Sequence, residues 1–156
     1  MEKVVINTPL GSLLICGNSD GITEVTFRDE LPISTQTPLV LEDAVQQITA
    51  YFQGKRTQFE LKIHPKGTSF QKKVWDFLQQ IPYGKTKSYQ EMANLLGDPK
   101  VIRAAAAANG KNPIAIIIPC HRVVGSDGSL TGYAGGLHRK KWLLEFESPV
   151  KQGELF

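Results

Sequence analysis

The sequence predicts an α+β fold, with a small N-terminal antiparallel β-meander and a helix, followed by a mainly helical C-terminal domain. Short β-rich runs separated by turn residues fill the first 27 residues, whereas helical apolar spacing and capping residues dominate residues 65–112. A hydrophobic content of 41% and a charged content of 21% are those of an ordinary globular chain. Its 156 residues suffice for one compact domain or two small ones.

The N-terminal domain, residues 1–64, is predicted to contain three strands and then a helix. Turn sequences such as Asn18-Ser19-Asp20-Gly21 separate the β-rich runs, which indicates a meander. The runs are residues 4–6, 11–16 and 22–27. Residues 39–53 carry apolar side chains at helical spacing, and Gly54 ends this helix. A short strand is expected over residues 59–63.

A second domain is predicted to begin after Pro65-Lys66-Gly67 and to extend to residue 148, which leaves residues 149–156 as a tail. Ser69 is the expected N-cap of its first helix, which runs to about Gln80. The sequence Pro82-Tyr83-Gly84 then ends the helix.

Two short helices around a tight turn predict a helix-turn-helix over residues 88–110. Ser88 and Glu91 have the spacing of a capping box at the start of the first helix. Asp98 is the expected N-cap of the second helix, with Pro99 at its first position. These local signals predict where both helices begin.

The second of these helices and its surroundings favour a polyanion as partner. Arg103 is followed by five consecutive alanines, whose small side chains allow close approach to another surface. Residues 65–112 contain eight lysines and arginines against three acidic residues, whereas residues 1–64 contain five against eight. Such an asymmetry suggests a face that binds a polyanion. The alternative is an ordinary packed helix with a solvated arginine and a solvated basic surface.

The pair Cys120-His121 follows a run of apolar residues, 114–118. The run predicts a buried strand, which Pro119 ends. A thiol at the mouth of a buried strand, beside a titratable imidazole, is the arrangement that nucleophilic catalysis needs. The alternative is a buried structural cysteine with a chance histidine neighbour.

Other residues exclude several classes of protein. Two cysteines and three scattered histidines show no zinc-type spacing, so we expect no metal and no cofactor. The chain has no apolar run as long as a membrane span. Glu2 and Lys3 argue against a secretory segment. We therefore expect a cytoplasmic, monomeric protein without membrane contact, in which Cys16 is a buried strand residue with a free thiol.

Around Cys120 the sequence Pro119-Cys120-His121-Arg122-Val123 is the active-site signature of the O6-alkylguanine-DNA alkyltransferases, DNA repair proteins that this chain resembles. The resemblance covers residues 65–147, and the first 64 residues fit that family in length and pattern only. The neighbours that match in order and spacing are Ser88-Tyr89, Arg103, Asn112-Pro113, Gly132-Tyr133-Ala134-Gly135-Gly136, Lys140, Trp142, Leu143-Leu144 and Glu147.

The resemblance implies that Cys120 accepts an alkyl group irreversibly. A free cysteine has a pKa of about 8.5 and is mostly protonated at neutral pH. The resemblance implies that a relay from Glu147 through His121 and a water deprotonates the thiol. On extended backbone, adjacent side chains point to opposite sides, so we expect the water to bridge them. Glu145 is the rival carboxylate. Because the thioether that forms is inert to water, each molecule would react once.

The resemblance also implies roles in binding the base. Tyr89 would donate a proton to the departing guanine, and a core aromatic residue is the alternative. Asn112 would tie the helix-turn-helix to the active-site strand. Ala134 stands where family members often have serine. The residues expected at the substrate are Val123, Tyr133, Asn112, Ala134 and Gly135.

Chemistry on a base inside a duplex requires that the nucleotide be extruded. By resemblance, Arg103 would fill the vacated stack, with the alanine-rich helix in the minor groove. The residues predicted to contact double-stranded DNA are Ser88, Lys100, Arg103, Ala104, Lys111 and Arg122.

The resemblance therefore implies a suicide methyltransferase that repairs O6-alkylguanine, with O4-alkylthymine as a further candidate substrate. A DNA-binding sensor of alkyl damage in which Cys120 is inert, and a thiol hydrolase that uses cysteine, histidine and glutamate, are the rival interpretations. The last five residues, Gln152-Gly153-Glu154-Leu155-Phe156, resemble peptides that dock bacterial sliding clamps. The alternative is that Leu155 and Phe156 pack onto the domain.

Overall fold

The computed structural model describes residues 1–149, so the clamp prediction for residues 152–156 lies outside the described residues. These residues form two compact units, Met1–Gly67 with Pro113–Ile117, and Thr68–Asn112 with the chain from Ile118 onward. The boundary after Gly67 lies three residues beyond the predicted one. The return of the short segment 113–117 to the N-terminal unit was not predicted. Within residues 1–149, no helix has the length and apolar character needed to cross a membrane.

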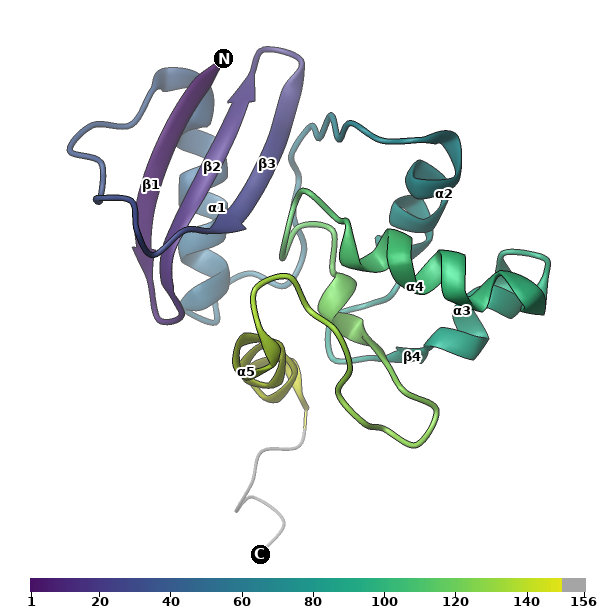
Figure 1. The fold of residues 1–156 in the computed structure, drawn as a ribbon. Coiled ribbons are helices and arrows are strands. Elements are labelled where there is room, and N and C mark those ends of the chain that lie inside the picture. Colours follow the sequence, from purple (N-terminus) through teal and green to yellow (C-terminus); the bar gives the residue numbers. More distant parts are fainter. Residues whose placement is uncertain (150–156) are drawn as a thin grey trace, which may run out of the picture. The chain divides into compact units, whose positions relative to one another are not determined.

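The N-terminal unit is built on the predicted antiparallel meander. It consists of β1 (Glu2–Thr8), β2 (Gly11–Asn18) and β3 (Gly21–Phe27), paired in this order. Helix α1 (Glu42–Phe52) lies against one face of this sheet and is preceded by a 3-10 turn, Leu39–Leu41 (Figure 1). Leu13, Ile15 and Ile48 are fully buried in the core. On β2, Cys16 is buried with a free thiol, as predicted.

Two predicted strands are absent from this unit. Residues 59–63 form only a single bridge, between Ile63 and Ile22, and the run 114–118 forms one between Ile114 and Val25. After Ile114 the chain turns, and Ile116 has a φ of 72°, a left-handed conformation that is rare for a β-branched residue. The run is nevertheless buried. A continuous apolar run indicates burial but carries no period, so it could not distinguish a strand from a buried turn.

The second unit is mainly helical. It contains α2 (Ser69–Leu78), β4 (Lys87–Ser88), α3 (Tyr89–Leu95), a 3-10 turn (Pro99–Val101), α4 (Ile102–Gly110), a 3-10 turn (Cys120–Arg122), β5 (Val123–Val124) and α5 (Leu137–Glu147). Strands β4 and β5 pair in parallel. Helix α4 packs against both α2 and α3, and the fully buried Trp75 donates from Nε1 to the carbonyl of Ala108 at 2.9 Å. The predicted α+β class is confirmed, and α3 and α4 form the helix-turn-helix (Figure 1).

Capping residues start these helices. The predicted N-cap of α2, Ser69, is wrong, because Thr68 accepts from the Gln71 amide at 3.1 Å while the Gln71 side chain accepts from the Thr68 amide at 2.9 Å. The capping box of Ser88 and Glu91 is as predicted, with bonds of 3.0 and 3.1 Å. Both boxes satisfy amide groups that have no partner inside the helix.

Ser88→Ala is expected to lower the free energy of unfolding by about 1 kcal/mol, because the first turn of α3 loses the acceptor for the Glu91 amide. Chemical denaturation would measure this loss. The exposed Ser126 provides a matched control, and Ser126→Ala should change the free energy of unfolding by less than about 0.5 kcal/mol. Equal effects of the two substitutions would contradict the prediction.

Candidate active site

Cys120 opens the 3-10 turn Cys120–Arg122 and is only 6% exposed. The extended backbone expected at this point is wrong, since the amide of Cys120 donates to the carbonyl of Ile118 at 2.8 Å. With three residues per turn, neighbouring side chains diverge by about 120°. Burial raises the pKa of the Cys120 thiol, while a hydrogen bond with Asn112 and the charge of Lys140 act in the opposite direction.

His121, Arg122 and Glu147 form one buried cluster. Glu147 Oε2 lies 2.8 Å from His121 Nε2, and Arg122 donates to the same carboxylate from Nε at 2.8 Å and from Nη2 at 3.0 Å. Burial raises the pKa of Glu147, but hydrogen bonds from His121 and Arg122 outweigh it and lower the value to about 2. The carboxylate is therefore ionised at neutral pH and can only accept.

The ionised carboxylate fixes the protonation of the imidazole. Burial lowers the pKa of His121, although Glu147 acts to raise it, so the ring is neutral at pH 7. Since Glu147 can only accept, Nε2 carries the hydrogen and Nδ1 keeps a lone pair. Among the described residues, Nδ1 has no hydrogen-bond partner although it is buried. His121 thus presents a basic nitrogen that no described side chain uses.

Two sequence predictions are decided by this cluster. Arg122 was expected to contact DNA, but its side chain is 7% exposed, and its Nη1 donates to the carbonyl of Ile81 at 2.7 Å. A guanidinium enclosed in this way cannot reach a phosphate, so that prediction is wrong. Glu145, the rival carboxylate, lies on the outside of α5, where it pairs with Lys141 at 3.9 Å and both side chains are 68% exposed.

Tyr89 and Lys140 meet at one backbone carbonyl. Tyr89 is the first residue of α3, and its hydroxyl donates to the Thr131 carbonyl at 2.8 Å. Lys140 Nζ donates to the same carbonyl at 2.9 Å and lies 3.4 Å from Tyr89 Oη. Burial raises the pKa of Tyr89 and lowers that of Lys140 to about 8. The charge of Cys120 acts to raise the pKa of both groups.

The end of α4 is tied to the residues around the cysteine. Asn112 Nδ2 donates to the Ile118 carbonyl at 2.7 Å, and Asn109 Nδ2 donates to the Cys120 carbonyl at 3.4 Å. The contact of Asn112 agrees with the predicted link between the helix-turn-helix and the cysteine. Sequence reasoning missed Asn109, although an asparagine three residues before Asn112, near the end of an alanine-rich helix, was a usable signal.

The remaining substrate-site candidates differ in accessibility. Val123 is buried in β5, Gly135 and Tyr133 are partly buried, and Ala134 is exposed. Burial raises the pKa of Tyr133. Within residues 1–149, three buried side-chain polar atoms lack a partner, namely Asn109 Oδ1, His121 Nδ1 and Tyr133 Oη. All three belong to residues beside Cys120, where a water or a ligand could satisfy them.

Helix α4 presents an accessible face. Ala105 and Ala108 are buried, whereas Arg103, Ala104 and Ala107 are exposed. Of the other residues predicted to contact DNA, Lys100 and Lys111 are exposed, and Ser88 is buried with its hydroxyl used in the capping box. A face of small side chains with one long cation is therefore available on the helix-turn-helix.

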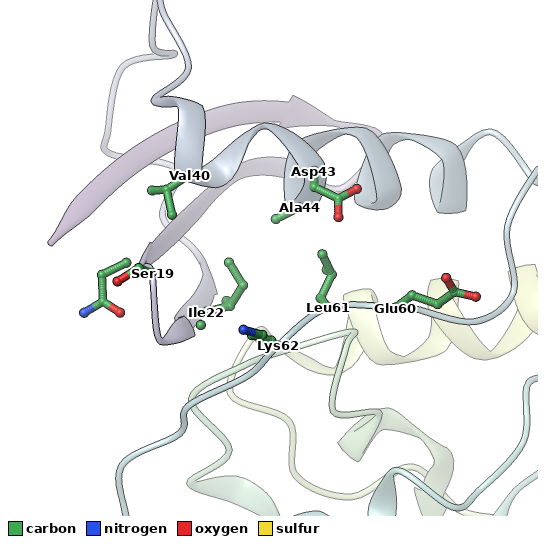
Figure 2. Close-up of a pocket in the computed structure, with 10 residues that line it drawn as sticks. Ser19, Ile22, Val40, Asp43, Ala44, Glu60, Leu61 and Lys62 are labelled. Atoms are coloured by element: carbon green, nitrogen blue, oxygen red, sulfur yellow. The ribbon is translucent and has the colours of Figure 1, made fainter.

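Neither of two cavities found in the described residues is lined by Cys120. One of about 240 Å³ in the second unit is lined by Val124, Leu144 and Glu147 among others, but not by Cys120 or Tyr89. One of about 340 Å³ in the N-terminal unit is lined by that unit alone. In Figure 2, side chains of α1, including Asp43, lie across this space from Ile22 and Leu61.

A helix-turn-helix joined to a buried cysteine, histidine and glutamate site defines a DNA-binding protein with a cysteine nucleophile. A family model described as "6-O-methylguanine DNA methyltransferase, DNA binding domain" matches residues 69–149. A second, described as "6-O-methylguanine DNA methyltransferase, ribonuclease-like domain", matches residues 1–65. The chain belongs to the 6-O-methylguanine DNA methyltransferase family, as the sequence predicted.

Individual relatives agree over nearly the whole chain. The chain is 48% identical over 149 residues to the methylated-DNA–protein-cysteine methyltransferase of Methanosarcina barkeri, which covers 92% of this chain and 94% of the relative. The protein of that name from Mycobacterium tuberculosis is 46% identical over 155 residues, covering 96% and 94%.

Solved structures agree as well. The crystal structure of the Mycobacterium tuberculosis O6-methylguanine methyltransferase has a TM-score of 0.86 and 42% identity, covering 99% of this chain and 96% of that one. That of Mycobacterium tuberculosis OGT in complex with DNA has a TM-score of 0.84 and 42% identity, covering 94% and 93%.

Proposed function

We propose that the protein repairs O6-alkylguanine in double-stranded DNA by moving the alkyl group to Sγ of Cys120, as a monomer that reacts once. The observation that carries this proposal is the buried His121–Glu147 pair beside a buried free thiol. Two relatives, each covered over 94% of its length, are named for transfer to a protein cysteine. A sensor with an inert cysteine does not need such a pair, so that alternative is not favoured.

The first step is removal of the thiol proton. The free Nδ1 of His121 would take it through a bridging water, because the two side chains diverge on the 3-10 turn. The imidazolium that results is stabilised by the Glu147 carboxylate at 2.8 Å. The positive charges of Lys140 and of the imidazolium favour the thiolate that remains.

The second step is an in-line displacement. The thiolate of Cys120 attacks the alkyl carbon, the bond between that carbon and O6 breaks, and its electron pair stays on guanine. Tyr89 would then give its hydroxyl proton to the base, exchanging the Thr131 carbonyl for a new acceptor. Asn109, Tyr133 and the backbone at Val123 would contact the base. Since none of these groups can displace a thioether, the protein is consumed.

Access to the base requires extrusion of the nucleotide, for which the exposed face of α4 is suited. Arg103 would occupy the vacated position in the stack, with Ala104 and Ala107 against the minor groove. Lys100 and Lys111 would contact phosphates.

Arg103→Ala is therefore expected to slow transfer from a duplex by about tenfold or more, because filling the vacated stack offsets an extrusion cost of a few kcal/mol. The rate with free O6-benzylguanine should be unchanged, since a free base needs no extrusion. Single-turnover rates with the two substrates measure the difference. An equal loss with both substrates would show that Arg103 serves the site itself and not extrusion.

Intact-protein mass spectrometry tests the proposed function. The protein is mixed with an excess of duplex that contains one O6-methylguanine, and we expect a gain of one methylene mass at Cys120 that stops at one per molecule. Tight binding without any gain would establish a damage sensor. Repeated turnover of an ester without a gain in mass would establish a hydrolase.

A further inference from the structure

The chain reaches its cysteine through two three-residue turns. The first closes around Ile116, where the amide of Ile117 donates to the carbonyl of Ala115 at 2.8 Å. The second closes around Pro119, where the amide of Cys120 donates to the carbonyl two residues earlier at 2.8 Å. Pro119 has a φ of −82° and a ψ of 65°, the ordinary values of an inverse γ-turn. The turn at Ile116 is of the other kind.

This first turn is strained. The φ of Ile116 is 72°, which belongs to the rare form of the γ-turn and is least favourable for a β-branched residue. Within residues 1–149, no other residue except glycine has a positive φ. The side chain of Ile116 is 1% exposed, so the surrounding core holds this conformation in place. Strained residues of this kind cluster at functional sites, where the strain contributes to preorganisation.

Before Ile116 the chain is paired with strand β3. Val25 donates from its amide to the carbonyl of Pro113 at 2.9 Å, and its carbonyl accepts from the amide of Ala115 at 2.9 Å. Ile114 lies opposite Val25 in this bridge. Ala115 is thus fixed on β3, and the turn that follows sets the direction in which the chain leaves the strand.

After the turn, the carbonyl of Ile118 accepts two hydrogen bonds. Asn112 donates to it from Nδ2 at 2.7 Å, and the amide of Cys120 donates at 2.8 Å. Asn112 also forms a hydrogen bond with the Cys120 thiol, which favours the thiolate. Because Ile118 is two residues from Ile116, a change in the backbone of Ile116 displaces this carbonyl and the thiol with it.

We propose that Ile116 is a positioning residue, whose left-handed turn places the Ile118 carbonyl and, through it, the Cys120 thiol for attack on the alkyl carbon. The inference rests on the proposed function, in which Cys120 Sγ is the nucleophile. The active feature is the backbone conformation of Ile116 and not its side chain. A nucleophile displaced by about 1 Å loses up to about 10²-fold in rate, so a small change of the turn has a large effect.

A simpler role must be separated from this one, because Ile116 is also a buried apolar side chain. Two substitutions make the separation. Ile116→Gly and Ile116→Ala both remove nearly all of the side chain and leave a similar cavity. Glycine adopts a φ of 72° readily, whereas alanine is strained there and relaxes toward a negative φ. A difference in rate between these two variants therefore reports on the backbone.

The test measures single-turnover transfer from a saturating duplex that contains O6-methylguanine, with the full chain, and binding of that duplex by fluorescence anisotropy. Ile116→Gly should keep a rate within about threefold of wild type, and Ile116→Ala should be slower by about tenfold or more. Both variants should bind the duplex as wild type does, since the face of α4 is unchanged. Equal rates in the two variants, or a slower glycine variant, would overturn the inference.

Ile117 provides the matched control. It is also buried, at 9% exposure, but its φ is not positive. At this position Ile117→Gly should transfer no faster than Ile117→Ala. A faster glycine variant here as well would assign the effect to flexibility near the cysteine and overturn the inference.

Ile116→Val decides the matter if the smaller residues do not fold. Valine keeps the branched side chain, the burial and the turn, so its rate of transfer should equal that of wild type. A rate lowered about tenfold in Ile116→Val would show that packing of the side chain controls the reaction. That result would overturn the inference.

The pH dependence of alkylation by iodoacetamide gives a readout that needs no DNA. Peptide mass spectrometry follows the modification of Cys120, whose reactivity rises with pH as the thiolate forms. In Ile116→Ala this rise should move to higher pH, because Asn112 and Lys140 favour a displaced thiolate less, and in Ile116→Gly it should stay at the wild-type pH. An unmoved profile in the alanine variant would overturn the inference. Failure of the proposed function looks different, since the wild-type protein would then gain no methyl group from the duplex while the two profiles still differed.

Discussion

Cys120→Ala is expected to abolish alkyl transfer completely while binding of alkylated duplex persists. No other thiol can replace it, because Cys16 is buried in β2, where burial also raises its pKa. The exposed face of α4 and its basic residues are untouched, so the phosphate contacts that dominate affinity remain. Mass spectrometry for transfer and fluorescence anisotropy for binding would measure the two effects on one preparation.

Cys16→Ala is the matched control for this prediction. It removes a buried thiol from the N-terminal unit and should keep stoichiometric transfer to Cys120. A methyl group found on any residue of the Cys120→Ala protein after reaction with the duplex would show that the nucleophile has been misassigned.

Glu147→Gln is expected to have the second large effect, on both stability and rate. The amide leaves the Arg122 guanidinium buried without a counter-charge, which costs about 3–5 kcal/mol of stability. His121 loses the carboxylate that orients its ring and stabilises its charged form, so transfer should slow by about 10²–10⁴-fold. Denaturant unfolding and single-turnover rates would measure the two losses.

Glu145→Gln, two residues away on the same helix, provides the comparison. Its carboxylate pairs with Lys141 at the exposed surface, where such pairs contribute little, so we expect both quantities to stay near wild type. If Glu145→Gln slowed transfer and Glu147→Gln did not, the carboxylate of the relay would be the other one.

The same carboxylate predicts how stability depends on pH. The pKa of Glu147 is about 2 in the folded protein against an ordinary 4.5, so its contribution is fully present above pH 4.5 and is lost as the pH falls toward 2. This contribution is about 3 kcal/mol. His121 acts in the same direction below pH 6.5, because its pKa is lowered by burial. Glu147→Gln should therefore flatten the acid limb of the stability profile.

How much of the fold could be predicted depended on how local its signals are. The meander and the capping box at Ser88 depend on residues that are close together in the sequence, and both were predicted correctly. The sequence Thr68-Ser69-Phe70-Gln71 also has the spacing of a capping box. The prediction of Ser69 as the N-cap overlooked it. The path of residues 113–117 depends instead on pairing with Val25, about 90 positions earlier, and no local pattern encodes it.

In the site, too, local signals could be predicted from the sequence and tertiary contacts could not. A short motif identified Cys120 and His121, and the family resemblance supplied Glu147. Charged residues ordinarily lie at the surface, so sequence alone assigned Arg122 to DNA and could not tell buried Lys140 from exposed Lys141. Their burial follows from how α5 packs against the 3-10 turn at Cys120, which is a tertiary fact.

The segment 113–117 has a consequence for anyone who would divide this protein. The outer edge of β3 at Val25 is closed by two hydrogen bonds of 2.9 Å, to Pro113 and from Ala115. A fragment of residues 1–65, cut where the family description ends, would leave those groups unpaired beside an apolar strand, which invites edge-to-edge aggregation. During synthesis, likewise, the N-terminal sheet cannot close its edge until about fifty residues beyond Gly67 have been made.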